Sequence, residues 1–522
     1  MPAFPALNDR NKAARLIVVL GDQLDPTIGP VADATDDDVV LMMEVDEEST
    51  HVPSHKQRTA LFLSAMRHFA VDQRERGNRV RYVEITDSHN THSFEGEIKR
   101  AVDACRPASV HVTHPGDWRV MQKLEVLADE LDIPVEIHPD EHFLTPLETF
   151  REWADGRKQW TMEYFYREQR KRLGILMQDD GKTPIEDRWN FDEDNRETFK
   201  QSPRPPKPYT PRADEITEEV LDLVARRFTK NPGNLDDFRW PVTREQARRA
   251  LDDFIENRLA RFGPYEDAMW EGEPFLYHSL LSAAGNLKLL DPRECVRKAV
   301  GAYESGGAPL NSVEGFVRQW IGWREFIRGV YWVQGADYPS RNGLDHDGSL
   351  PGFYWDAETD MNCMRDCLSQ VRDHAFAHHI PRLMVMGNFA MLAGVHAREV
   401  ADWYLAMFVD AVDWASNPNT IGMSQHADHG VVGTKPYAAS GKYIARMSNY
   451  CKGCKYDPRE RSGSSACPFN TLYWDFLLRH ADRFRSNNRM AMMIKNAERI
   501  KKGERVELTT RASELRDGWG VS

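Results

Sequence analysis

The stretch LIVVLGDQLD, residues 16–25, joins a short β-branched run to a polar loop that begins with glycine. Comparable apolar runs recur along the first part of the chain, at 39–45, 80–86, 109–113 and 134–138. Amphipathic helical patterns separate several of these runs, at 55–77, 93–105 and 118–132. Such alternation is typical of a parallel, doubly wound sheet. We therefore expect an α/β domain over residues 1–140.

The loop GDQLD, residues 21–25, is the first candidate for a ligand-binding segment. Ligands of open parallel sheets bind at the carboxyl ends of the strands, and this loop directly follows the first predicted strand. No GxGxxG motif follows that strand, so the fingerprint of a dinucleotide-binding βαβ unit is absent.

A proline-rich segment separates this domain from the rest of the chain. Residues 201–213 contain five prolines in thirteen positions, which excludes a helix and predicts an extended linker. We place the interdomain region at 141–213 and a helical domain at 214–522, with Asp214 as an N-cap. Further helices are predicted at 243–261, 292–304, 312–331, 362–378, 381–392, 397–411 and 468–485.

Composition limits the class of protein. The net charge is -13, which argues against a protein that coats nucleic acid indiscriminately but permits a local basic groove. The longest apolar runs are too short to cross a bilayer. The N-terminal sequence MPAFPALNDRNKAAR has no apolar signal core. We expect a cytoplasmic protein without a membrane partner.

Three cysteines form the strongest local motif. Cys451 and Cys454 make a CxxC pair, and Cys467 follows after a loop rich in glycine and serine. A CxxC places two thiolates close enough to bind one metal ion. The fourth ligand must come from elsewhere, with Cys363 and Cys367 as candidates. Spacing alone leaves zinc and an iron–sulfur cluster both open.

Three other groups of polar residues are candidates for a functional site. His378 and His379 are adjacent, so on a helix their side chains point about 100° apart. One can act as an acid–base group with the other as support, although a histidine in an apolar helix is often a core residue. Asp410 and Asn419 lie in a polar stretch that suits either turns or a flavin ring. Arg324 lies in an aromatic-rich helix, where an unpaired charge is costly.

Several motifs together resemble the cryptochrome/photolyase family. They are GDQL at 21–24, HSLLSAAGN at 278–286, WREF at 323–326, AHHIPRLM at 377–384, FVDAVD at 408–413, NTIGMSQ at 419–425 and YCKGCKYDP at 450–458. The resemblance runs from about residue 14 to 490. It is closest to the iron–sulfur bacterial cryptochromes and photolyases, whose repair members act on (6-4) pyrimidine photoproducts.

This resemblance implies the photolyase fold and three cofactors. FAD is expected in the helical domain, against His278, Ser279, Ser282, Gln319, Trp323, Arg324, Asp410 and Asn419. A [4Fe-4S] cluster is expected on Cys363, Cys451, Cys454 and Cys467, with Cys363 preferred to Cys367. A 6,7-dimethyl-8-ribityllumazine antenna is expected near Gly21, Asp22, Gln23, Leu24 and Glu44. The family's electron-transfer positions fall on Trp403, Tyr404, Trp355 and Tyr443.

The implied activity is light-dependent repair of (6-4) photoproducts in UV-damaged DNA by a monomeric lyase. The lesion must be flipped out of the duplex, and the strand's phosphates would be met by basic residues such as those at 165–173. Repair of this lesion needs a general acid as well as an electron, and histidine is the natural type. We expect His378 and His379 to be catalytic, with His378 closer to the lesion.

The sequence leaves three other functions open. A blue-light photoreceptor of the same family would carry the same cofactors but would need no proton donor. A cyclobutane dimer photolyase would return its electron without a general acid. A light-independent nucleic-acid-binding protein with structural zinc would lack a flavin site altogether.

Overall fold

The computed structural model describes residues 12–521, so the first eleven residues of the predicted α/β domain lie outside the described part. Five parallel strands form one sheet in the order β3-β2-β1-β4-β5. Their bounds are β1 (Arg15–Val18), β2 (Val39–Met43), β3 (Val80–Val83), β4 (Ser109–Thr113) and β5 (Val135–His138). The predicted doubly wound parallel sheet is thereby confirmed.

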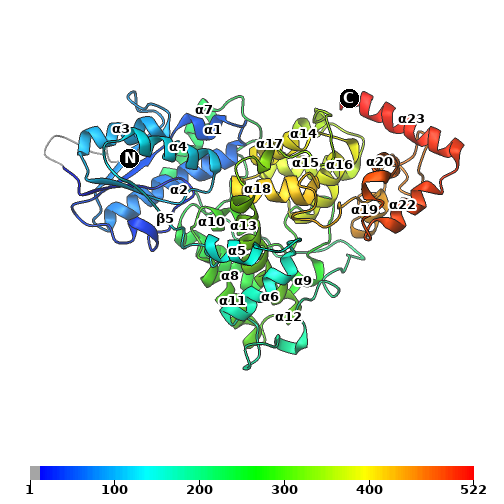
Figure 1. Ribbon diagram of the computed structural model, residues 1–522, viewed down its shortest axis with the longest axis horizontal. Helices are drawn as coiled ribbons and strands as arrows, with labels where there is room; N and C mark the ends of the chain where they lie inside the picture. The colour runs from blue at the N-terminus through cyan, green and yellow to red at the C-terminus, as the bar shows by residue number, and fades with distance from the viewer. Residues whose placement is uncertain (1–11, 522) are drawn as a thin grey trace.

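Helices cover both faces of this sheet (Figure 1). They are α1 (Asp46–Thr50), α2 (Lys56–Glu75), α3 (Phe94–Cys105) and α4 (Trp118–Glu130). Leu16 and Val110 pack on one face in the same buried cluster as Ile98 of α3 and Leu124 of α4. Ile17 packs on the other face in the cluster that includes residues of α2. From β1 the strand order runs one way to β2 and β3, and the other way to β4 and β5. A ligand-binding crevice opens at the strand ends between β1 and β4, where the two directions meet.

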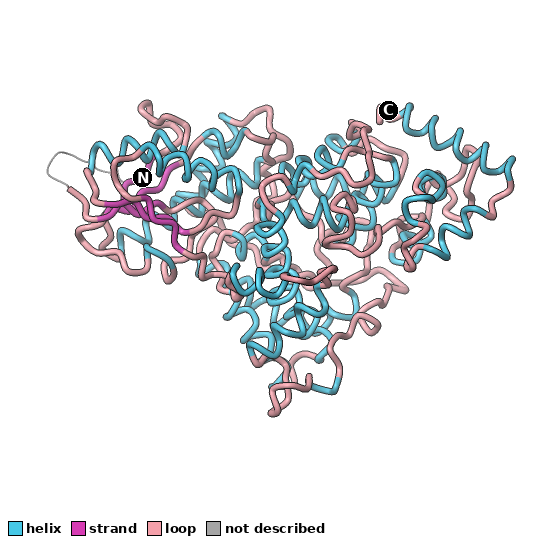
Figure 2. The backbone as a smooth tube through the Cα atoms, viewed as in Figure 1, coloured by secondary structure: helices cyan, strands magenta, loops and turns pink. Residues whose placement is uncertain are grey.

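The remainder of the described chain is helical, and all the strands gather at one end of the molecule (Figure 2). The segments up to the middle are α5 (Leu147–Ala154), α6 (Met162–Leu173), α7 (Glu215–Arg227), α8 (Arg244–Asn257), α9 (Leu259–Tyr265), α10 (Ser282–Asn286), α11 (Pro292–Glu304), α12 (Leu310–Val317) and α13 (Arg324–Gln334). They are followed by α14 (Phe353–Asp356), α15 (Asn362–His374), α16 (Asn388–Ala393), α17 (Ala397–Met407), α18 (Asp413–Asn417), α19 (Gly441–Met447), α20 (Pro468–Arg479), α21 (Ala481–Phe484), α22 (Ala491–Glu498) and α23 (Lys502–Gly518). Short 3₁₀ turns occur at Gly29–Val31, Ile185–Asp187 and Tyr338–Ser340.

Two helices, α6 and α7, pack on other parts of the molecule than the predicted regions to which they belong. Asp214 caps α7 as predicted, because its carboxylate accepts the Thr217 backbone N–H at 3.0 Å. However, α7 packs on α2 of the α/β part, through Val220 and Val224. Within the predicted linker region, α6 packs on the segment around Trp320. The apolar faces of α6 and α7 therefore attach the region 141–227 to the helical part and to the α/β part of the protein.

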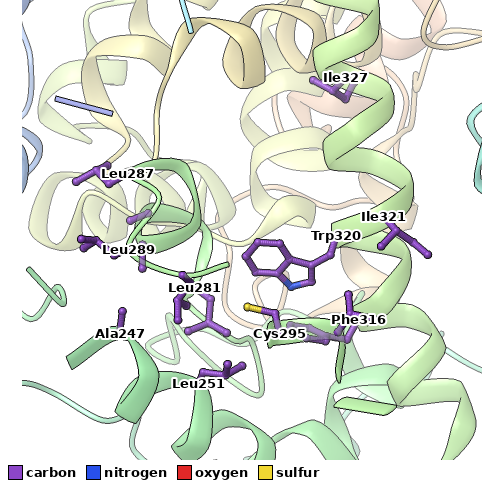
Figure 3. Packing of buried hydrophobic residues seen from close by; sticks show 14 of the residues in the cluster. Ala247, Leu251, Leu281, Leu287, Leu289, Cys295, Phe316, Trp320, Ile321 and Ile327 are labelled. Atoms are coloured by element: carbon purple, nitrogen blue, oxygen red, sulfur yellow. The ribbon is translucent and has the colours of Figure 1, made fainter. Parts of the chain in front are cut away.

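The core of the central helical lobe contains an inserted tryptophan (Figure 3). The indole of Trp320 projects from its helix into a cluster that contains Leu281, Cys295 and Phe316. Gly285 of α10 permits this approach, since a Cβ atom there would lie 2.7 Å from Trp320 Cη2. This contact fixes α10, and with it the predicted flavin-binding serines, against the long helix that carries WREF.

Among the described helices, none combines the length and the apolar character required to cross a membrane.

Candidate active site

Three π-helical segments mark the region in which most predicted flavin-binding residues lie. They are η3 (Arg318–Trp323), η5 (Pro381–Gly387) and η6 (Pro418–Ser424). Such wider turns are rare and occur frequently at functional sites. Gln319 and Trp323 lie in η3, Asn419 lies in η6, and η5 begins directly after the histidine pair. The η5 and η6 segments contact one another.

A hydrogen bond joins the segment of the expected FAD contacts Ser279 and Ser282 to the polar stretch that begins at Asp410. Asn286, at the end of α10, donates its side-chain amide to the Asp410 carbonyl at 2.8 Å. The Asp410 carboxylate in turn accepts two hydrogen bonds from Arg382, at 3.0 and 3.1 Å. Ser279 and Ser282 lie just before and at the start of α10. Residues from three distant parts of the sequence thus meet in one place.

The histidines form a stacked group at the edge of this region. His278 stacks on His378 with ring centroids 4.0 Å apart, and His379 stands edge-on to both at 5.8 Å. Burial, together with the neighbouring His379, lowers the pKa of His278 well below that of a free imidazole. Burial and the neighbouring His278 do the same to the pKa of His378. Both rings are therefore neutral at physiological pH.

The two adjacent histidines differ sharply in exposure. His378 is 5% exposed, whereas the His379 side chain is 53% exposed and lies 3.4 Å from the Asp267 carboxylate. Only His379 is thus accessible to a large substrate. A second acid lies beside this surface, because burial raises the pKa of Glu266 to about 7 despite the neighbouring Arg318.

Buried polar atoms without a partner fit a polar ligand in this region. Within the described part of the chain, His278 Nε2 and Gln425 Oε1 are buried and make no hydrogen bond. An unsatisfied buried polar atom costs free energy unless something outside the chain pairs with it. Gln425 follows directly on η6, where the predicted flavin residue Asn419 lies.

Arg324, one of the predicted flavin contacts, is bound by groups of the protein itself. Its guanidinium reaches His142 Nδ1 at 2.8 Å and Glu325 at 3.0 Å, and it lies 3.9 Å from the centre of the Phe143 ring. The cost of burying this charge is therefore offset by partners within the protein. Two other predicted contacts are exposed: Gln319, and Asn419, whose amide donates to the Ala415 carbonyl at 2.8 Å.

Aromatic residues at the predicted electron-transfer positions lie behind η5. Trp403 and Tyr404 belong to α17, and both are buried. Trp403 stands edge-on to Tyr354 at 5.1 Å, and the next residue, Trp355, is 38% exposed. The Tyr404 hydroxyl donates to the Arg382 carbonyl at 2.5 Å. Tyr443 lies on α19. The ring contacts lead from the buried Tyr354 of α14 through Trp403 to Tyr404, whose hydroxyl binds the backbone of the arginine that pairs with Asp410.

Four cysteines surround one small cavity. It is lined by Cys363 at the start of α15, by the CxxC pair after α19, and by Cys467 at the N-cap of α20. Among the described residues, no three cysteine sulfurs lie within 4.8 Å of one another. A single tetrahedral zinc would hold its sulfurs only about 3.8 Å apart. The four thiols are thus spread around the cavity more widely than the ligands of one bound zinc ion.

Cys367 lies outside this cavity. Its thiol contacts the Tyr450 hydroxyl at 3.8 Å, one turn along α15 from Cys363. Asn470, which the sequence analysis did not single out, organises the cysteine loop. Its amide donates to the carbonyls of Pro458 and Glu460, and its oxygen accepts the Gly441 N–H. An asparagine three residues after Cys467 was the available signal in the sequence.

A cavity of about 100 Å³ opens at the carboxyl ends of the strands. Gly21, Asp22 and Glu44 line it, as do residues from α1, α2 and the loop after β4. Its far wall comes from Val412 and Asp413 of the helical part. The cavity thus occupies the crevice that the strand order defines, at the predicted antenna position.

The predicted antenna residues differ in their freedom to meet a ligand. Burial raises the pKa of Asp22 to about 6, and its carboxylate lies against Gly116. The Glu44 carboxylate is committed to the protein, since it accepts from Arg67, from the Tyr82 hydroxyl and from a backbone N–H. Gln23 lines a smaller neighbouring cavity. Leu24 is fully buried in the core.

The cavity wall also contains polar residues that the sequence analysis missed. They are Glu48, Ser49, His51, Arg58, Asp117 and Asp413. Burial and the hydrogen-bonded Asp117 raise the pKa of Asp413. Asp117 could have been found from the strand-end rule, because it follows β4. Asp413 could not, because its position depends on how the two parts of the protein dock.

Some basic residues of α6 are buried in contacts with the protein, and others are exposed. Arg170 is 1% exposed, and its guanidinium donates to the carbonyls of Leu176 and Trp189. Lys171 is exposed and lies 5.3 Å from the centre of the Trp189 ring. Only part of the positive charge at 165–173 is therefore available to a nucleic acid.

Comparison with known proteins places this architecture in a family. A family model described as deoxyribodipyrimidine photo-lyase-related protein matches residues 17–240. The chain is 48% identical over 502 residues to the (6-4) photolyase of Agrobacterium fabrum, covering 96% of this chain and 98% of that protein. The chain therefore belongs to the cryptochrome/photolyase family, in the bacterial class that its motifs predicted.

Solved structures show the same fold. A bacterial class III photolyase from Agrobacterium tumefaciens superposes with a TM-score of 0.59 at 15% identity, covering 91% of this chain and 98% of that one. The cryptochrome of Synechocystis sp. PCC6803 superposes with a TM-score of 0.53 at 12% identity, covering 86% and 89%. The predicted photolyase fold is confirmed.

Proposed function

We propose that this protein is a light-dependent lyase that repairs (6-4) pyrimidine photoproducts in UV-damaged DNA. The observation that carries the proposal is the 48% identity to a (6-4) photolyase over 96% of the chain. The exposed histidine beside the predicted flavin region supports it chemically. A cyclobutane dimer photolyase and a pure photoreceptor would not need that proton donor.

FAD is the cofactor we assign to the region around α10, η5 and η6. The residues present fit it, because His278 Nε2 and Gln425 Oε1 are buried polar atoms without partners. Ser279, Ser282, Asp410 and Asn419 would hold it, together with the outer π-helical residues Gln319 and Trp323. When bound and reduced, FAD supplies an electron under blue light. The chain's own residues must position the lesion and manage the protons.

We propose His379 as the group that donates a proton to the lesion. This reverses the order expected from sequence, and the reason is exposure: a bulky flipped base can reach His379 but not the buried His378. The stacked rings of His278 and His378 contact the ring of His379 on one side, and the Asp267 carboxylate lies 3.4 Å from its Nε2. Glu266 is a second proton carrier within this surface.

The remaining cofactors and properties are proposals on the same basis. The wide spacing of Cys363, Cys451, Cys454 and Cys467 favours a [4Fe-4S] cluster over zinc. The strand-end cavity suits an antenna such as 6,7-dimethyl-8-ribityllumazine, although Gln23 and Leu24 lie outside it. Trp403, Tyr404, Trp355 and Tyr443 are the proposed electron-transfer residues. We propose a cytoplasmic monomer.

One experiment separates repair of the two lesions from signalling. Purified holoprotein is illuminated with blue light in the presence of two oligonucleotides, one with a (6-4) photoproduct and one with a cyclobutane dimer. We expect restoration of the (6-4) oligonucleotide alone, with no restoration in darkness. Repair of the dimer instead would assign a cyclobutane dimer photolyase. Flavin photoreduction without any repair would assign a photoreceptor.

A further inference from the structure

A cluster of two histidines and one glutamate lies at the edge of the sheet, on β4 and β5. His111 is the register partner of Glu136, and His138 lies two residues further along β5. Alternate residues of a strand project to the same face, and register partners share a face. The three side chains therefore converge on one side of this edge of the sheet.

The ligand atoms of this cluster form a compact triangle. His111 Nδ1 lies 2.8 Å from His138 Nε2. A carboxylate oxygen of Glu136 lies 3.7 Å from the same His111 nitrogen and 3.9 Å from the same His138 nitrogen. Ligand atoms around a tetrahedral zinc are about 3.3 Å apart. The observed separations bracket that value, so small ring rotations would bring all three atoms onto one ion.

The surroundings of His111 favour the tautomer that a metal needs. The Ser109 hydroxyl lies 2.8 Å from His111 Nε2 and can accept a hydrogen bond from its N–H, which leaves the Nδ1 lone pair directed toward His138 and Glu136. Ligating histidines almost always engage their other ring nitrogen in this way.

An ion can reach the cluster from solvent. The exposed fraction of the side chain is 8% for His111, 34% for His138 and 55% for Glu136, so the site is backed by protein and open in front. Arg15 of β1 is the cation on the adjoining strand. Its guanidinium pairs with Asp38 at 2.7 Å and with Asp33 at 3.7 Å, which limits its repulsion of a bound cation.

We propose that His111, Glu136 and His138 bind a divalent transition-metal ion, Zn²⁺ by preference, with water in the fourth position. Two imidazoles and a carboxylate form a borderline donor set that suits zinc and binds Ni²⁺ and Cu²⁺ as well. Because the ligands come from two adjacent strands, the ion fastens the edge strand β5 to β4. This site is separate from the proposed flavin, cluster and antenna sites.

The test measures zinc bound by the full-length holoprotein. Equilibrium dialysis against Zn²⁺ with metal analysis is compared for wild type, His138→Ala and Glu136→Ala, both at accessible positions. We expect each variant to bind one zinc fewer, with affinity at this site reduced by more than about 100-fold. Zinc should raise the melting temperature of wild type more than that of either variant. The matched control is His89→Ala, an exposed histidine whose described carboxylate partner is Asp87.

A second histidine group must be distinguished in the same experiment. The ring nitrogens of His278, His378 and His379 also lie within 4.8 Å of one another. A His379→Ala variant therefore serves as a further comparison, and its loss of zinc should add to that of His138→Ala. Equal zinc binding by wild type, His138→Ala and Glu136→Ala would overturn the proposal. So would a zinc-edge anomalous map of soaked crystals without a peak among the three side chains.

Discussion

Arg382 binds the carboxylate of Asp410 through both terminal nitrogens, at 3.0 and 3.1 Å, from segments that lie on either side of α16 and α17. The same Arg382 donates to the Ala377 carbonyl and lies 3.9 Å from the centre of the Phe408 ring. The pair thus holds the histidine segment, η5 and the start of the polar flavin stretch in one arrangement.

Replacing Asp410 by Asn should release this arrangement. The variant keeps the side-chain volume but leaves Arg382 without its counter-charge, which costs about 3 kcal/mol when such a pair is largely buried. We expect the midpoint of urea unfolding to be correspondingly lower. We also expect the flavin to be released faster, which is seen as a faster rise of its fluorescence. Asp402→Asn is the matched control, because Asp402 pairs with Arg398 on the surface and should contribute less than about 1 kcal/mol. Equal stability of the two variants would contradict the role of the pair.

Replacing His379 by Ala should reduce repair of the (6-4) photoproduct by about 100-fold or more, the usual contribution of a general acid. Flavin photoreduction and the melting temperature should stay unchanged, since the side chain is 53% exposed. The assay is single-turnover repair under blue light, with His396→Ala as an active control. Full repair by His379→Ala would rule out the proposed proton donor.

Replacing Cys363 by Ser should remove iron from the purified protein, whereas Cys367→Ser should retain it. The physical reason is that only Cys363 lines the cavity shared with Cys451, Cys454 and Cys467. Iron and acid-labile sulfide analysis of both variants decides the matter. Zinc in place of iron in the wild-type protein would contradict the cluster itself.

Replacing Trp403 by Phe should slow photoreduction of the flavin by an external reductant. Trp403 lies between the ring of Tyr354 and that of Tyr404, at 5.1 and 5.3 Å, so it is the central member of the proposed route. Absorbance changes under blue light measure the rate. The control is Trp153→Phe, a buried tryptophan in a different aromatic cluster. Equal rates in both variants would remove Trp403 from the route.

The protein should lose stability as the pH falls below about 6.5, in part through a buried histidine pair. His346 Nε2 lies 3.0 Å from His480 Nε2, and burial lowers the pKa of His346 to about 2 and that of His480 to about 4. Both rings are neutral when folded but bind protons near pH 6.5 when unfolded. The unfolded state therefore gains protons first, and the free energy of unfolding decreases as the pH drops from 6.5 toward 4.

Urea unfolding at pH 7, 6 and 5 measures this effect. A single such histidine contributes a slope of up to about 1.4 kcal/mol per pH unit. His480→Gln should therefore show a shallower pH dependence than wild type, although it is less stable at pH 7. If the free energy of unfolding changed equally with pH in wild type and variant, this pair would not titrate on unfolding.

The sequence predicted the sheet well because strand and helix alternate with clear hydrophobic periods. It also pointed to cysteines that line one cavity, because CxxC is a local pattern. It was less successful where the outcome depends on docking. Val220 and Val224 gave α7 an apolar face but not the identity of the partner, α2. Arg324 required a counter-group, yet no local pattern distinguishes His142 from a flavin phosphate. Likewise, the order of His378 and His379 rests on which ring faces solvent.

The strand-end cavity has a consequence for the way this protein can be divided. Its floor comes from the first 120 residues, but Val412 and Asp413 close it from nearly three hundred positions later in the chain. In a fragment confined to the α/β part, the cavity would be open on the side that Val412 and Asp413 cover. The proposed antenna cavity is therefore formed jointly by both halves, and we expect loading of a chromophore to report whether the halves have assembled.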